Sequence, residues 1–117
     1  MYPGRYQITD YTSTDDYSIG VKASLSRQIT EVDIKRMAEV TGDYNPLHLD
    51  EAFAKRTRFN GRIAHGVFSA GLISVVLGTK LPGAGGIYLK QTLEFLYPVR
   101  IGDLLTAEVE VTAWKAD

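Results

Sequence analysis

The chain has 117 residues, of which 44% are hydrophobic, carries a formal net charge of -1 and contains no cysteine. This length predicts one domain with a modest core. The near-neutral charge argues against nucleic acid or a membrane surface as a partner, and the lack of cysteine excludes disulfides, thiolate zinc sites and cysteine nucleophiles. Because the first 20 residues are polar and the longest apolar run, 67–78, is too short to span a bilayer, we expect a cytoplasmic protein.

Residues 1–18 are rich in Tyr, Thr, Ser and Asp and show no periodicity, which predicts a flexible N-terminal arm in front of a domain over 19–117. Residues 21–29 then alternate between apolar and polar side chains, the pattern of a half-buried strand. Its apolar face is predicted to consist of Val21, Ala23, Leu25 and Ile29.

A short helix is predicted to follow this strand. Thr30 and Asp33 have the spacing of a capping box, with Asp in place of the usual Glu or Gln. Gly42 suits the position just after a helix, because glycine readily adopts the left-handed backbone found there. Asp43 is therefore expected in a loop. The helix is expected to bury an apolar stripe formed by Val32, Met37 and Val40.

The loop beyond this helix contains Asn45 and Pro46. Proline has no N–H to donate and pushes the residue before it toward extended backbone, so we expect a turn here rather than a regular helix. Asp50 is predicted to cap a second short helix over 51–56. A basic cluster stands near its end, which a solvated surface explains most simply: Lys55, Arg56 and Arg58.

The second half of the chain predicts one long helix and two more strands. Residues 66–80 are apolar or small on almost every side, as in a buried helix, and the glycine-rich stretch 81–86 ends it. Residues 87–97 and 105–113 alternate as strands do, with a turn at 101–103 between them. This order predicts an α+β fold in which a curled antiparallel sheet wraps around one buried helix.

Asp43, His48 and Gly66 are the parts of an acid/base site that acts on a carbonyl compound. A carboxylate and an imidazole five residues apart across a turn can converge on one water. Gly66 stands at a helix start, where unsatisfied N–H groups suit a developing oxyanion. Each residue also has a purely structural explanation: Asp43 as a helix terminator, and His48 and His65 as histidines that fix the backbone.

Two other kinds of site fit the sequence less well. Asp43, His48 and His65 contain metal-binding side chains, but their spacing matches none of the compact zinc patterns, so we expect no metal. The sequence contains no Gly-x-Ser-x-Gly elbow, the motif that carries the nucleophilic serine in one common hydrolase fold, so serine hydrolysis is disfavoured.

The motif Asp43-Tyr-Asn-Pro-Leu-His48, followed by Arg62-Ile-Ala-His-Gly66, resembles the hydratase motif of the MaoC-like, (R)-specific enoyl-CoA hydratases. The likeness runs from about Val21 to the end of the chain and includes 81–89 and 98–103. It implies a hot-dog fold and syn hydration of a trans-2-enoyl-CoA to a (R)-3-hydroxyacyl-CoA, a reversible reaction. No cofactor is implied, because CoA is part of the substrate.

The resemblance also implies roles for single residues. Asp43 and His48 are implied as the catalytic pair and Gly66 as part of the oxyanion hole, while Ser74 supports the aspartate. Asn45, which helps to shape the turn, and His65 are expected near the substrate. A homodimer or higher homo-oligomer is implied as well. For the basic cluster, contact with the phosphates of a CoA-type ligand is the alternative to a solvated surface.

The family pattern predicts about two further strands after Asp117, so we expect either a truncated domain or pairing with another chain. Two alternatives to hydration remain open. One is a hot-dog thioesterase, in which a carboxylate acts on the thioester carbonyl itself. The other is a non-catalytic module that binds acyl-CoA.

Overall fold

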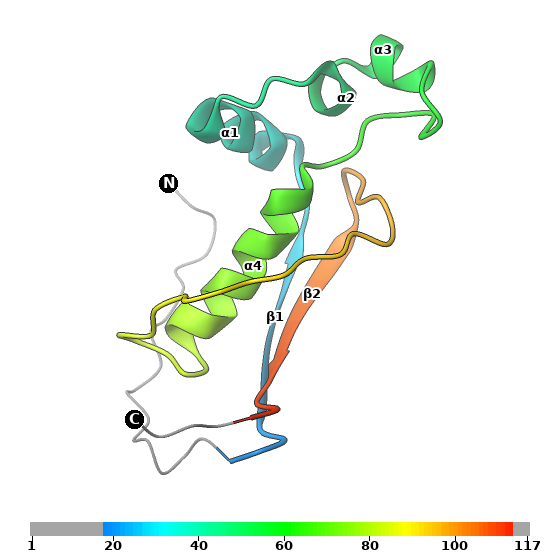
Figure 1. Cartoon of the computed structure of the whole chain (residues 1–117). Coiled ribbons are helices and arrows are strands. Elements are labelled where there is room, and N and C mark those ends of the chain that lie inside the picture. Colours follow the sequence, from blue (N-terminus) through cyan, green and yellow to red (C-terminus); the bar gives the residue numbers. More distant parts are fainter. Residues whose placement is uncertain (1–17, 114–117) are drawn as a thin grey trace. The chain divides into compact units, whose positions relative to one another are not determined.

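The computed structural model describes residues 18–113, so 1–17 of the predicted arm lie outside the described residues. Its contacts divide the chain into two compact units. Among the described residues the first comprises 18–25, 71–92 and 106–113, and the second comprises 26–70 and 93–105. The described part is α+β, and its elements are, in chain order (Figure 1), β1 Lys22–Gln28, α1 Glu31–Thr41, α2 Pro46–Leu49, α3 Glu51–Lys55, α4 Gly66–Thr79 and β2 Leu104–Glu110.

The two strands pair as an antiparallel sheet in which β1 is the neighbour of β2. In the second unit Ile29 donates its N–H to the Asp103 carbonyl at 2.9 Å, and the Ile29 carbonyl accepts the N–H of Gly102 at 2.8 Å. Exposure alternates along both strands, so the predictions of strands at 21–29 and 105–113 are confirmed, although β2 ends at Glu110.

α1 begins and ends as predicted, since Thr30 and Asp33 form the capping box and Gly42 takes a left-handed φ of 80°. The predicted buried stripe is wrong, because Val32 and Val40 are 51% and 81% exposed. The helix instead buries Asp33, Ile34 and Ala38. Burial of a carboxylate is possible here because Asp33 pairs with Arg27 and accepts the Thr30 N–H at 2.9 Å.

The expected turn at Asn45 and Pro46 is in fact the start of a helical turn, α2. Asn45 has the extended ψ of 122° that a following proline imposes, and its side chain caps the N–H of Leu47. Pro46 occupies the first helical position, where its missing N–H would have no intrahelical partner anyway. The next helix agrees with its prediction, because Asp50 caps α3.

The predicted strand at 87–97 is wrong, since this segment has no strand structure and its apolar side chains at Ile87, Leu89 and Phe95 are exposed. α4 has the predicted extent but only Leu72 and Val76 are buried in it. The absence of the strand has a physical reason. Alternation makes a segment compatible with a sheet, but a strand forms only where a neighbouring backbone accepts its hydrogen bonds. In the described residues the sheet has two strands.

The second unit has its own small core. Ile29, Ile34 and Ala64 are buried together, and four half-buried side chains pack against them: Leu49, Phe68, Val99 and Leu105. This core anchors the end of β1, α1 and the segment that leads into α4. Within residues 18–113 no helix has the length and apolar character needed to cross a membrane.

Candidate active site

The three residues predicted for catalysis all line one cavity of about 430 Å³ in the second unit. Most of its polar lining comes from three segments: the loop and single turn after α1, the stretch before α4, and the first turn of α4. Apolar walls come from 95–99. The polar side chains in the lining are Asp43, His48, Arg58, His65, Ser69 and Tyr97.

Asp43 follows directly on Gly42, whose left-handed backbone turns the chain out of α1. The Asp43 N–H donates to the Thr41 hydroxyl at 3.1 Å, and one carboxylate oxygen accepts the Asn45 N–H at 3.2 Å. Asn45 in turn caps α2 through its own side chain, 3.0 Å from the Leu47 N–H. The carboxylate is thus exposed to the cavity and oriented by local backbone hydrogen bonds. The Asn45 side chain is used to cap the backbone of α2.

His48 lies on α2 and is only 8% exposed. Its Nδ1 is 2.8 Å from the Ile63 carbonyl oxygen. A carbonyl can only accept, so Nδ1 carries a proton, and in the neutral ring Nε2 keeps its lone pair. That is the form of an imidazole that takes a proton from water.

His65 is 2% exposed and stands just before α4. Its Nε2 lies 3.0 Å from the backbone carbonyl of Asp43, so Nε2 is the donor in this ring. Its Nδ1 is buried and has no hydrogen-bond partner among the described residues. The bond to Asp43 supports the structural explanation for His65, and a contact with substrate stays a prediction.

One ligand atom each from Asp43, His48 and His65 lies within 4.8 Å of the others. Donors around a tetrahedral zinc ion lie about 3.4 Å apart, as Zn–N bonds of about 2.0–2.1 Å require. The two imidazole planes are inclined by 31°. The expectation that this group holds no metal stays a prediction.

Gly66 opens α4, and the first N–H groups of a helix lack intrahelical acceptors. The structure places a neighbour that the sequence did not predict. A Cβ on Gly66 would lie 3.0 Å from Cε1 of Phe95 and 3.1 Å from its Cζ. The absence of a side chain therefore lets the Phe95 ring lie directly over the start of this helix.

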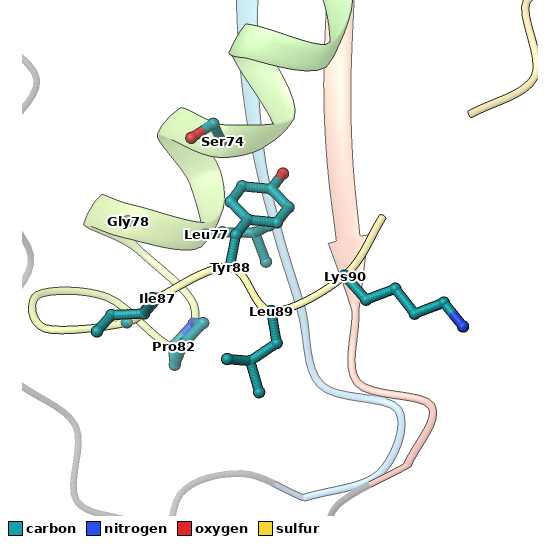
Figure 2. Close-up of a pocket in the computed structure, with 9 residues that line it drawn as sticks. Ser74, Leu77, Gly78, Pro82, Ile87, Tyr88, Leu89 and Lys90 are labelled. Carbon is teal, nitrogen blue, oxygen red and sulfur yellow. The ribbon is translucent and has the colours of Figure 1, made fainter. Parts of the chain in front are cut away.

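Ser74 belongs to the first unit, so its support of Asp43 stays a prediction. There it lines a separate cavity of about 440 Å³ with an otherwise mainly apolar lining. Figure 2 shows Ser74 and Leu77 on α4, the Tyr88 ring beside them, and Lys90 pointing away from the helix.

Among the basic cluster only Arg58 is part of the lining of the cavity that holds Asp43 and His48. Its guanidinium lies 4.8 Å from the Phe59 ring centroid. Sequence reasoning gave no role to Arg62, although this residue stands inside the motif. Its Nε donates to the His48 carbonyl at 2.6 Å, and its two terminal nitrogens bind Glu31.

The comparisons with known proteins agree on one family. A family model described as "MaoC like domain" matches residues 17–117. The chain is 54% identical over 97 residues to a "3-hydroxybutyryl-CoA dehydratase" of Methylorubrum extorquens, covering 83% of this chain and 62% of that protein. It is 48% identical over 105 residues to an "(R)-specific enoyl-CoA hydratase" of Aeromonas caviae, covering 90% of this chain and 78% of that protein.

The solved structures give the same result. The "(R)-hydratase from A. caviae involved in PHA biosynthesis" superposes with a TM-score of 0.82 at 49% identity, covering 86% of this chain and 76% of the other. The chain thus spans about three fifths of the length of the Methylorubrum relative, and more of the Aeromonas one. Sequence motif, cavity residues and comparisons together show that the chain belongs to the family of MaoC-like domains.

Proposed function

We propose that this chain adds water to trans-2-enoyl-CoA and forms (R)-3-hydroxyacyl-CoA, and that it also catalyses the reverse dehydration. The observation that carries the proposal is the meeting of Asp43 and His48 at one cavity beside the start of α4. The names of the similar proteins from Methylorubrum and Aeromonas support this substrate class and stereochemistry.

The geometry suits one water held between the Asp43 carboxylate and Nε2 of His48. As the water oxygen forms its bond to C3, the pair removes a proton from it. The same pair then delivers a proton to C2 from the same side, so that H and OH both come from water and add syn. His48 is prepared for this role because its other nitrogen is committed to the Ile63 carbonyl.

Charge builds up on the thioester oxygen while C3 is attacked. We place this oxygen near the N–H of Gly66, where the helix start offers donors and a favourable dipole. A thioester that reaches this backbone must displace or slide past the ring of Phe95, which covers Gly66. Arg58 at the same cavity offers a cation for a phosphate of the CoA moiety.

The finer features of the fold belong to the same proposal. We propose a hot-dog domain over 19–117, in which 87–97 pairs as a strand once a further strand or another chain lies beside it. The exposed apolar side chains of this segment and the TM-score to the Aeromonas hydratase support that arrangement. We propose that such domains assemble into a homodimer or a higher homo-oligomer in the cytoplasm.

Crotonyl-CoA provides the test. Hydration removes the absorbance band of the conjugated enoyl thioester without releasing thiol, and chiral analysis of the product gives its configuration. Thiol release would identify a thioesterase instead. Binding with neither change would identify a non-catalytic module, and either of these two results would overturn the proposal.

A further inference from the structure

Arg62 makes three hydrogen bonds that join two helices of the second unit. Its Nε donates to the His48 carbonyl at 2.6 Å. Its terminal nitrogens donate to both carboxylate oxygens of Glu31, at 2.8 and 3.0 Å. The Arg62 side chain is only 12% exposed, whereas that of Glu31 is 41% exposed, so the guanidinium is shielded from water and the carboxylate lies nearer the surface. Glu31 is the first residue of α1 and His48 lies in α2, so one guanidinium links the start of one helix to the other.

The residue after Arg62 completes a closed set of bonds around His48. The Ile63 carbonyl accepts Nδ1–H of His48 at 2.8 Å, and the Ile63 N–H donates to the Leu47 carbonyl at 3.3 Å. The main chain and the ring of His48 are therefore held by two adjacent residues of one segment. If the backbone of α2 moved relative to that segment, the ring would lose the acceptor that fixes its tautomer.

We infer that Arg62, anchored by Glu31, is a positioning residue that keeps the catalytic imidazole of His48 as the Nδ1–H tautomer, with its Nε2 lone pair directed to the reacting water. This inference rests on the proposed role of His48 in hydration. Arg62 acts through the carbonyl and not by touching substrate: it is absent from the residues that line the cavity.

Only arginine fits this position. Its planar guanidinium offers a two-pronged face to a carboxylate while Nε still points at a third acceptor. A lysine keeps the charge but is a single point donor, and it cannot serve Glu31 and the His48 carbonyl with the same geometry. Glu31 matters because it accepts hydrogen bonds from the two terminal nitrogens of Arg62, which fixes the direction in which Nε points.

The test combines kinetics with a spectroscopic measurement on the full chain. A long-range proton–nitrogen correlation spectrum shows which ring nitrogen carries the proton, and the chain has only two histidines. We expect opposite tautomers in the unaltered protein, Nδ1–H for His48 and Nε2–H for His65. In Arg62→Lys and Glu31→Gln the His48 signals should change to a mixture of tautomers, whereas His65 should be unaffected.

In the same two variants kcat with crotonyl-CoA should fall by about ten- to a hundredfold with KM changed by less than about twofold, as expected for a misdirected catalytic group. Arg100→Lys is the matched control. Arg100 also donates to a backbone carbonyl of this unit, that of Phe59 at 2.6 Å, but it does not contact His48. It should leave both tautomers and kcat as they are.

The inference is overturned if Arg62→Lys and Glu31→Gln keep the pure Nδ1–H form of His48, or if Arg100→Lys lowers kcat as much at an equal loss of melting temperature. Should Arg62→Lys fail to fold, Glu31→Gln decides alone, because it keeps the arginine and removes only the anchoring charge. An unaltered protein that does not hydrate crotonyl-CoA would refute the proposed function, while the tautomer comparison would still decide this inference.

Discussion

The imidazole rings of His48 and His65 lie with their centroids 3.9 Å apart and their planes inclined by 31°. Each ring donates one proton to a backbone carbonyl, His48 to Ile63 and His65 to Asp43. Two residues that are 17 positions apart thus fix the loop that carries the Asp43 carboxylate and the turn that carries the His48 imidazole against each other. The following predictions test what this arrangement does.

Asp43→Asn should keep the fold and lower turnover of crotonyl-CoA by about a hundredfold or more, the usual scale for a general acid/base group. The change is isosteric, and the Asn45 N–H that Asp43 accepts can still bind an amide oxygen. Asp50→Asn is the matched control, because asparagine caps a helix as well as aspartate does and Asp50 caps α3. Turnover near the unaltered level in Asp43→Asn would refute the assignment.

His48→Ala should reduce turnover to a similar extent, and the double variant with Asp43→Asn should be far from additive. If both groups act on one water, the first substitution already removes most of the rate enhancement, so the second substitution lowers kcat little further. The measurement is kcat for both single variants and the double variant on folded protein. If the two reductions simply multiplied, the residues would act independently and the shared-water scheme would be wrong.

Gly66→Ala should lower turnover more than stability. The added Cβ meets one edge of the Phe95 ring, at 3.0 to 3.2 Å, and that side chain is exposed enough to move aside. The methyl group then crowds the place where the thioester oxygen is proposed to bind. A misaligned oxyanion donor lowers kcat by about 10²–10³. A lowered melting temperature with normal turnover in the cold would favour a packing role alone.

Acid should weaken the contribution of Glu31 to stability. A hydrogen bond from Arg62 lowers the pKa of the Glu31 carboxyl below its usual 4.5, with further help from the charges of Arg62 and Lys35, while partial burial opposes this. A lowered pKa in the folded state means that the stabilisation is present above the unfolded value and is lost as pH falls through the folded one.

Urea unfolding at pH 7 should therefore find Glu31→Gln less stable than the unaltered chain, and the difference should shrink well below pH 4.5. Glu39→Gln is the control, since Glu39 is an exposed carboxylate on the same helix. A stability difference for Glu31→Gln that stays constant across this range would contradict the ion pair's contribution.

Gly42→Ala should destabilise the fold by about 1 kcal/mol, because an L-residue is strained in the left-handed backbone that Gly42 adopts. Nothing lies within 4 Å of the Cβ that alanine would add, so no clash contributes. Chemical denaturation measures the loss, and Gly71→Ala offers the control: this helical position is equally open and has ordinary helical backbone, so alanine should stabilise it. Equal effects at both positions would contradict the strain argument.

The local signals in the sequence were sufficient for the elements that depend on nearby atoms. The Thr30 and Asp33 capping box, the Gly42 helix end, the Asp50 cap and the turn after Arg100 all form through bonds within a few residues. The motif around Asp43 and His48 identified the family, which the match over 17–117 confirms. The roles given to single residues stay predictions: those of Asp43, His48, Asn45, His65, Gly66 and Ser74.

What depends on distant atoms was decided only by the tertiary structure. Residues 87–97 alternate like a strand yet form none here, because hydrogen bonds in a sheet come from a partner that the segment itself does not encode. Ile34 and Ala38 are buried in the core in place of Val32, because Asp33 pairs with Arg27 and the helix face that carries Asp33 points inward. The sequence alone likewise showed neither the Phe95 ring over Gly66 nor the bond from Arg62 to His48. Both join residues far apart in the chain, and only folding brings them into contact.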